Sequence, residues 1–153
     1  KNIVLERATT SIKTTGQLAN LIRKSIPTTK NKIDPATKTF QAIRIYLNDE
    51  ISELEKGLMA AEKILKPDGI LAAVSFHSIE DRIVKKFFLK CAKKESYSRH
   101  RPEHTIKNHS LEIISKKPIL PSQAEINTNN RSRSAKLRIA KRTNFPSYFG
   151  ETA

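Results

Sequence analysis

The segment ILAAVSF, residues 70 to 76, most constrains how this chain can fold. It is apolar without alternation, which predicts a strand covered on both faces in a parallel sheet. The motif KPDG, residues 66 to 69, precedes it and is suited to ending a helix in a turn. A short loop, His77 and Ser78, follows it and leads into an amphipathic helix. The order helix, turn, buried strand, loop, helix predicts an α/β fold.

His77 lies where open α/β sheets bind their ligands, in the loop after the carboxyl end of a strand. Two interpretations stay open: a working group of an active site, or a hinge histidine that hydrogen-bonds a neighbouring backbone group. Ser78 likewise has two interpretations, a site residue or a helix cap, because Ser78 and Asp81, three residues later, resemble a capping box. No Gly-x-Ser-x-Gly motif surrounds Ser78, so we do not expect a serine nucleophile.

Upstream of this unit, the sequence predicts two amphipathic helices. Thr14 or Thr15 is suited to capping the first. Asp34 is suited to capping the second, whose apolar residues recur every three or four positions from residue 40 to residue 65. That periodicity predicts a helical segment of about eight turns, bent or broken near Gly57.

Charge is distributed unevenly along the chain. The 153 residues include 29 Lys and Arg against 15 Asp and Glu, a formal net charge of +14. Residues 1 to 81 hold 12 basic and 10 acidic side chains, whereas residues 82 to 153 hold 17 and 5. The regional excess indicates a polyanionic partner, since clustered cations bind phosphates.

Two β-rich segments lie in the basic half, LEIISKKPILP at residues 111 to 121 and SAKLRIA at residues 134 to 140. The second alternates apolar residues with Lys136 and Arg138, which predicts a strand whose half-exposed face is basic. Between them, Arg131 and Arg133 stand among small polar residues, a composition suited to contacting phosphates. A solvated loop beside a charged strand is the alternative, and the local charge excess favours nucleic acid.

The remaining reactive side chains indicate no further chemistry. His100, His104 and His109 have suitable spacing for a metal, but Pro102 interrupts the helix that would gather them, so we expect no metal site. Cys91 ends an apolar stretch and is interpreted as a packing residue. A single cysteine excludes an internal disulfide, which fits a reducing compartment.

No apolar run reaches the length that spans a membrane, and the start of the chain lacks the apolar core of a signal peptide. We therefore expect a soluble, cytoplasmic protein without a membrane partner. The chain opens on Lys1 rather than Met, in the middle of a pattern, which indicates a fragment whose upstream part is missing.

Three blocks of the sequence resemble the signature blocks of the RsmH (MraW) family, in the same order and at similar spacing. They are DPATKTFQAIRIYLNDEISELEKGL from residue 34, LKPDGILAAVSFHSIEDRIVKKFF from residue 65, and NNRSRSAKLRIAKR from residue 129. The resemblance covers most of the chain. It implies an S-adenosylmethionine-dependent methyltransferase that modifies the exocyclic amine (N4) of a cytosine in the decoding region of 16S ribosomal RNA.

The resemblance also implies a fold: a partial class I S-adenosylmethionine-dependent methyltransferase sheet, Rossmann-like, with part of an inserted all-helical domain. Residues 1 to 50 would be the partial insertion, and residues 51 to 153 the C-terminal part of the methyltransferase core. ILAAVSF would be the fifth strand, with an unpaired edge. LEIISKKPI and SAKLRIA would pair as an antiparallel hairpin.

Family members hold the cofactor with a Gly-rich loop and an acidic residue, and neither has a counterpart here. The four glycines of this chain are far apart in the sequence: Gly16, Gly57, Gly69 and Gly150. We therefore expect no cofactor-binding residue in this chain, and no catalysis by the chain alone. A truncated, catalytically inactive RNA-binding fragment is the alternative function.

Within the family interpretation, His77, Ser78 and Asp81 are expected to shape the pocket for the target cytosine, which must leave its stack. We assign none of them a proton-transfer role. The expected partner is small-subunit ribosomal RNA or the 30S subunit, and the oligomeric state stays open. The expected RNA contacts are Arg44, Arg131, Arg133, Lys136 and Arg138, with Lys85 and Lys86 as weaker contributors.

Overall fold

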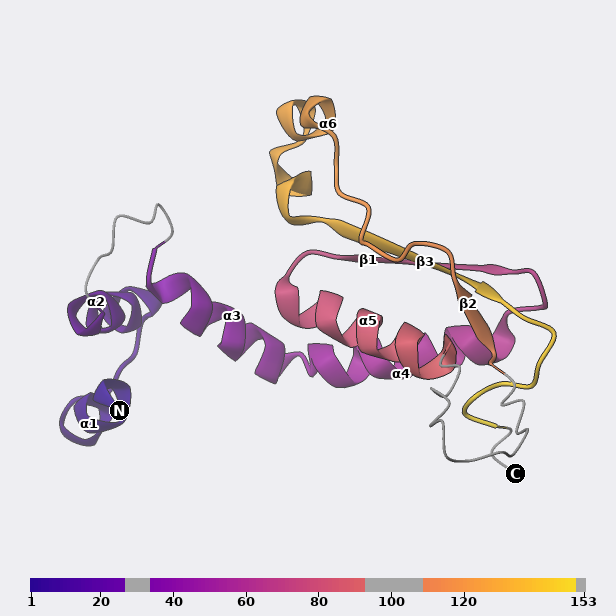
Figure 1. The fold of residues 1–153 in the computed structure, drawn as a ribbon. Helices are drawn as coiled ribbons and strands as arrows, with labels where there is room; N and C mark the ends of the chain where they lie inside the picture. The colour runs from indigo at the N-terminus through magenta and orange to yellow at the C-terminus, as the bar shows by residue number, and fades with distance from the viewer. Residues whose placement is uncertain (27–33, 93–108, 151–153) are drawn as a thin grey trace, which may run out of the picture. The chain divides into compact units, whose positions relative to one another are not determined.

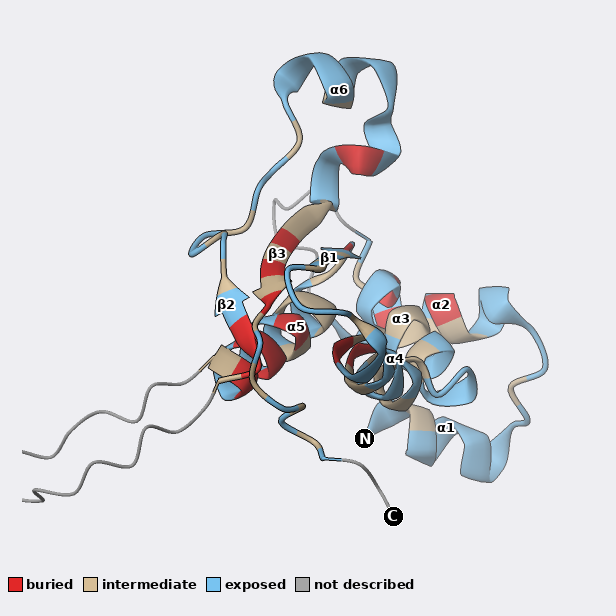
Figure 2. Ribbon diagram, turned by 90° about the vertical axis from the view of Figure 1, so that its right-hand side faces the viewer, coloured by how far each residue is buried: buried red, intermediate tan, exposed pale blue. Residues whose placement is uncertain are grey.

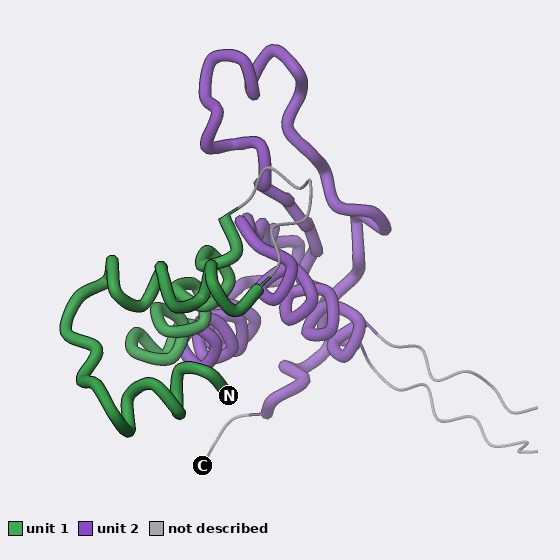
Figure 3. Tube along the Cα trace, turned by 90° about the vertical axis from the view of Figure 1, so that its left-hand side faces the viewer, with its two compact units in different colours: residues 1–50 green, residues 51–153 purple. Residues whose placement is uncertain are grey.

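A computed structural model of the chain describes residues 1–26, 34–92 and 109–150 (Figure 1). The fold is mixed α/β, and it divides into two compact units, residues 1–50 and 51–153 (Figure 3). None of the described helices is long and apolar enough to cross a membrane. In chain order the elements are α1 (Asn2–Thr9), α2 (Thr15–Ser25), α3 (Ala36–Leu47), α4 (Glu50–Ile64), β1 (Ile70–Ser75), α5 (Ser78–Ala92), β2 (Leu111–Ile113), α6 (Gln123–Thr128), the 3-10 helix η1 (Asn130–Ser134) and β3 (Lys136–Arg142).

The first unit is helical, and both helix starts expected from its sequence are confirmed. The Thr14 hydroxyl accepts the backbone N–H of Gln17, whose side-chain oxygen accepts the N–H of Thr14, a reciprocal capping box. Asp34 Oδ1 accepts the N–H of Ala36 at 2.9 Å at the start of α3. The small core of this unit consists of Ala19, Ile22 and Ala36.

The long helix predicted over residues 40 to 65 is two helices, and the predicted break at Gly57 is wrong. The break lies at Asn48 and Asp49, where Asp49 has a left-handed φ of 49°. Aspartate tolerates this conformation better than most residues. Gly57 instead lies inside α4, where a glycine costs only about 1 kcal/mol relative to alanine.

The second unit holds a three-stranded antiparallel sheet in the order β1-β3-β2 (Figure 1). The expected antiparallel pairing of the last two strands is confirmed, with Ile113 opposite Ala140. On its other side β3 pairs with β1, with Val74 opposite Leu137. Among the described residues no strand pairs with the outer side of β1, so this strand has the expected unpaired edge.

The prediction that residues 70 to 76 are covered on both faces is wrong for the described structure. Leu71 and Ala73 pack against the core on the α5 side, whereas Ile70 and Val74 are 52% and 57% exposed on the opposite face (Figure 2). Side chains alternate across a pleated strand, so one covering layer buries only every second residue. The described part of the second unit supplies one such layer.

The core of the second unit lies between α4, α5 and the sheet. Cys91 belongs to it, and burial raises the pKa of its thiol to about 12, with the negative charge of Glu62 adding to the effect. The interpretation of Cys91 as a packing residue is therefore confirmed. The buried core residues are Leu58, Val84, Phe87, Phe88, Cys91, Leu111 and Ala140.

The basic face of β3 points inward, so the prediction that it is the half-exposed face is wrong. Arg138 and Arg142 are each 7% exposed, whereas Leu137 and Ile139 on the opposite face are only partly buried. A buried guanidinium requires an anion or several carbonyl groups as partners. Both arginines have such partners, contributed by residues distant in the sequence.

Candidate functional site

The loop after β1 brings the three predicted pocket residues to one end of the sheet. The His77 side chain is 13% exposed, Ser78 is exposed as the first residue of α5, and Asp81 lies one turn further along the helix. Asp81 is 14% exposed and faces β3. The three residues therefore have different surroundings although they are close in sequence.

His77, not Ser78, caps α5, and its partner is Glu80. His77 Nδ1 accepts the backbone N–H of Glu80 at 3.3 Å, and Glu80 Oε2 accepts the N–H of His77 at 3.2 Å. The predicted Ser78–Asp81 capping box is therefore wrong, because Ser78 already occupies the first helical position. His77 Nε2 also lies 3.2 Å from Glu80 Oε1. The bond from the Glu80 N–H to Nδ1 is the backbone hydrogen bond that the hinge interpretation of His77 predicts, whereas Nε2 forms no hydrogen bond with the described residues.

Asp81 joins α5 to β3 through a bidentate ion pair. Its carboxylate accepts Arg138 Nε at 2.7 Å and Arg138 Nη2 at 3.2 Å, and Lys136 Nζ lies 3.5 Å away. The hydrogen bond from Arg138, together with the charges of Arg138 and Lys136, lowers the pKa of Asp81 despite its partial burial. Arg138, expected to contact RNA, is therefore buried against Asp81 instead, and Lys136 is close to the same carboxylate.

Phe76 is a surface aromatic at this site that sequence reasoning missed. It follows β1 directly, two residues before Ser78, and is 56% exposed. Its backbone N–H donates to Glu80 Oε2 at 2.8 Å, which holds the start of the loop against α5. An aromatic at the end of an apolar strand is ordinarily core, so only the structure could show that this ring is exposed.

Arg131 and Arg133 lie in a lobe formed by residues 122–134, which includes α6 and η1 and extends away from the sheet (Figures 1 and 2). Asn129 Oδ1 accepts the N–H of Arg131 at 3.1 Å, and the buried Ser132 hydroxyl donates to the Asn129 carbonyl. Both arginine side chains are exposed and have no hydrogen-bond or ion-pair partner within the described parts of the chain.

The other predicted RNA contacts differ in their availability. Arg44 forms a bidentate ion pair with Glu50, Nε to Oε1 at 2.7 Å and Nη2 to Oε2 at 3.1 Å, so its guanidinium is engaged. Lys85 and Lys86 are exposed on α5. Of the three clustered histidines, His100 and His104 lie outside the described residues, and the His109 ring packs against Phe145.

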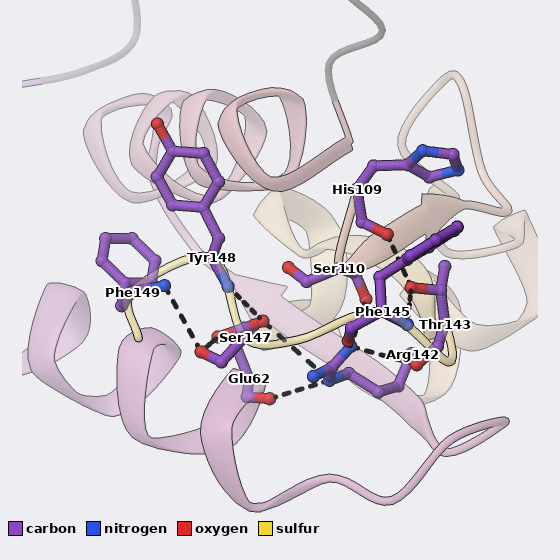
Figure 4. Close-up of polar contacts among 9 residues, drawn as sticks. All are labelled: Glu62, His109, Ser110, Arg142, Thr143, Phe145, Ser147, Tyr148 and Phe149. Atoms are coloured by element: carbon purple, nitrogen blue, oxygen red, sulfur yellow. Dashed lines mark hydrogen bonds and ion pairs between the residues drawn. The ribbon is translucent and has the colours of Figure 1, made fainter. Parts of the chain in front are cut away.

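A second polar cluster, also missed from the sequence, joins α4 to the C-terminal segment (Figure 4). The Glu62 side chain is fully buried, and its carboxylate accepts the Tyr148 N–H at 3.1 Å and the Ser147 hydroxyl. Arg142 Nη1 donates to the carbonyls of Ser110 at 3.0 Å and Phe145 at 2.7 Å. One buried acid and one buried base therefore fasten the segment that follows β3.

Comparison with known proteins covers nearly the whole chain. A sequence profile described as the MraW methylase family matches residues 1–143. The chain is 50% identical over 144 residues to "Ribosomal RNA small subunit methyltransferase H" of Rhodopseudomonas palustris (strain BisA53). It is 52% identical over 145 residues to the protein of the same name from Rickettsia akari (strain Hartford). These matches cover 94% and 93% of this chain but only 43% and 47% of the relatives, so the chain spans less than half their length.

Proposed function

The chain belongs to the MraW methylase family, and on this premise we propose that the whole protein methylates small-subunit ribosomal RNA. The proposed reaction transfers a methyl group from S-adenosylmethionine to N4 of a cytosine in the decoding region. The observation that carries the proposal is about 50% identity, over nearly the whole chain, to proteins named for this activity. Family membership favours this function over a catalytically inactive RNA-binding fragment.

The fold supports a place for the chain within such an enzyme. We propose that β1, β3 and β2 are part of a class I, Rossmann-like sheet, and that residues 51–153 form the C-terminal part of its core. Residues 1–50 would be part of an inserted helical domain. The antiparallel pairing of β3 with β2 and the exposed outer face of β1 support this assignment.

We propose that the described residues do not form the main cradle for the cofactor. A cradle for S-adenosylmethionine needs glycines that let the backbone approach the ligand closely. Gly57 lies within α4. A Cβ at Gly69 would come 2.8 Å from the Lys66 carbonyl oxygen, so Gly69 is required by the turn that precedes β1. We therefore derive no step of methyl transfer through residues of this chain, and we expect the chain alone to be inactive.

At the pocket, we propose separate roles for the three predicted residues. The Ser78 hydroxyl and the Phe76 ring are available to contact a base that has left its stack, because both side chains are exposed. His77 and Asp81 act as positioning residues, since one caps α5 and the other ties it to β3. Hydrogen bonds to α5 and an ion pair to β3 thereby hold the loop that would line the pocket.

A chimera tests this function best. In it, the segment of the Rickettsia akari relative that matches this chain is replaced by the chain itself. We expect it to methylate small ribosomal subunits from cells that lack the modification, giving N4-methylcytidine on nuclease digestion and mass spectrometry. The relative itself is the positive control, and the 153-residue chain alone should give no product. A chimera that binds subunits and cofactor but methylates another position would overturn the assignment.

For RNA binding, we expect the double variant Arg131→Ala/Arg133→Ala to weaken binding to small ribosomal subunits and to flatten its salt dependence. Each phosphate contact contributes roughly 0.7–0.9 to the slope of log K against log salt, so the loss should be roughly 1.4–1.8. Lys63→Ala/Lys66→Ala removes the same charge from exposed positions elsewhere and should leave the slope nearly unchanged. An unaltered slope in the arginine variant would remove both residues from the interface.

A further inference from the structure

One face of α5 carries a row of cations that are not part of the proposed pocket. Arg82, Lys86 and Lys90 are spaced by four residues, which places them along one side of a helix at intervals of about 6 Å. All three are exposed. We call these three residues the α5 stripe.

The stripe has no acidic partner within the described residues. The acids of α5, Glu80 and Asp81, both lie in its first turn and are engaged, one with His77 and the other with Arg138. Exposed cations of a solvated helix face commonly pair with acids three or four residues away. The stripe lacks such acids along its length, which leaves its charge available to an external anion.

The stripe ends at an exposed aromatic ring. Lys90 Nζ lies 5.3 Å from the centroid of the Tyr148 ring, and Tyr148 is 49% exposed. Phe149 lies behind it, 5.1 Å away in an edge-on arrangement, and stacks on Phe87 of α5 at 5.5 Å. The Tyr148 ring is thus held beside the helix with part of its surface open.

The buried cluster around Glu62 and Arg142 holds the backbone that carries this ring. Because Glu62 accepts the backbone N–H of Tyr148 and the hydroxyl of Ser147, the backbone at the ring is anchored to α4 (Figure 4). In the same view the Tyr148 ring points away from the polar cluster. A ring that is already ordered loses little conformational entropy when a ligand stacks on it.

We propose that the α5 stripe and Tyr148 form a binding surface for a single-stranded segment of RNA. The cations would contact successive phosphates, and a base would stack on the Tyr148 ring. Proteins that bind single strands combine a cationic track with aromatic platforms in this way, and cations beside the ring add to the attraction. This inference rests on the proposed function, since it assigns a further surface to the same RNA substrate.

Fluorescence anisotropy with a short, fluorescein-labelled single-stranded RNA tests the proposal in the 153-residue chain and in the chimera. Arg82→Gln/Lys86→Gln should reduce the salt slope by roughly 1.4, the loss of two single-strand phosphate contacts. Tyr148→Ala should weaken binding roughly tenfold through lost stacking, whereas Tyr148→Phe should bind as the unaltered protein does. Circular dichroism confirms that each variant retains its helix content.

The control Lys63→Gln/Lys66→Gln removes equal charge away from the stripe and should change the slope little. An equal reduction in that control, or unchanged affinity in Tyr148→Ala, would overturn the proposal. Preferential binding of the stripe to vesicles of phosphatidylserine and phosphatidylcholine would also overturn it, in favour of a lipid surface.

The failure of the stripe proposal and the failure of the proposed function give different results. Methylation by the chimera with no effect of the stripe variants on RNA binding would refute only the stripe proposal. RNA binding through the stripe by a chimera that methylates nothing would refute only the enzymatic function.

Discussion

Replacing Arg142 by Met in the 153-residue chain should lower the free energy of unfolding of the second unit by about 3–5 kcal/mol. The Arg142 side chain is 8% exposed, lies 3.9 Å from the fully buried Glu62 carboxylate and donates to several carbonyls. Methionine fills a similar volume but leaves that carboxylate without its nearest cation and the carbonyls without their donor. Hydrogen exchange at the amides of β3, read by mass spectrometry, measures the loss.

Lys141→Met is the matched control for this substitution. Lys141 is the preceding residue of β3, on the opposite face, and its ammonium pairs at the surface with Asp68 at 2.6 Å. Because water screens that pair, its removal should alter protection far less than Arg142→Met does. Equal effects of the two substitutions would mean that the buried cluster does not hold the second unit together.

Asp81→Ala should have the next largest effect, a loss of about 3 kcal/mol. The substitution leaves the Arg138 guanidinium, 8% exposed, without the carboxylate that accepts two of its hydrogen bonds. Arg138→Met should cost a similar amount, and the double variant should cost much less than the sum, since neither charge is then left alone. Hydrogen exchange at the amides of α5 and β3 measures the three losses of stability, which together form a double-mutant cycle. Losses that simply add would contradict a direct interaction between Asp81 and Arg138.

The same pair predicts how stability depends on pH. Since Arg138 lowers the pKa of Asp81 in the folded chain, this carboxylate contributes stability that is fully present above its unfolded pKa of about 3.9. The contribution is lost as the pH falls through the lower folded pKa. The stability of Asp81→Ala should therefore fall less than that of the unaltered chain as the pH decreases through this window. If both stabilities decline in parallel, a group other than Asp81 is responsible for the pH dependence.

Much of the local structure follows from local patterns. The capping residues Thr14 and Asp34 were identifiable because a cap bonds to a backbone group only two or three residues away. The helix break at Asp49 was not identifiable from the sequence, because the apolar periodicity continues through it and a left-handed residue has no sequence pattern of its own. Likewise, His77 paired with Glu80 is a capping box that escapes notice because histidine is an uncommon cap.

The sequence by itself determined the family and the strand and helix segments around residues 70 to 88. Through the family resemblance it also implied the antiparallel pairing of the last two strands. Only the tertiary structure decided that Arg138 faces inward, because its partner Asp81 lies 57 residues away. The same holds for Glu62 and Tyr148, which are 86 residues apart. Periodicity marks which residues share a face of an element, but the side on which that face is buried depends on groups that only folding brings together.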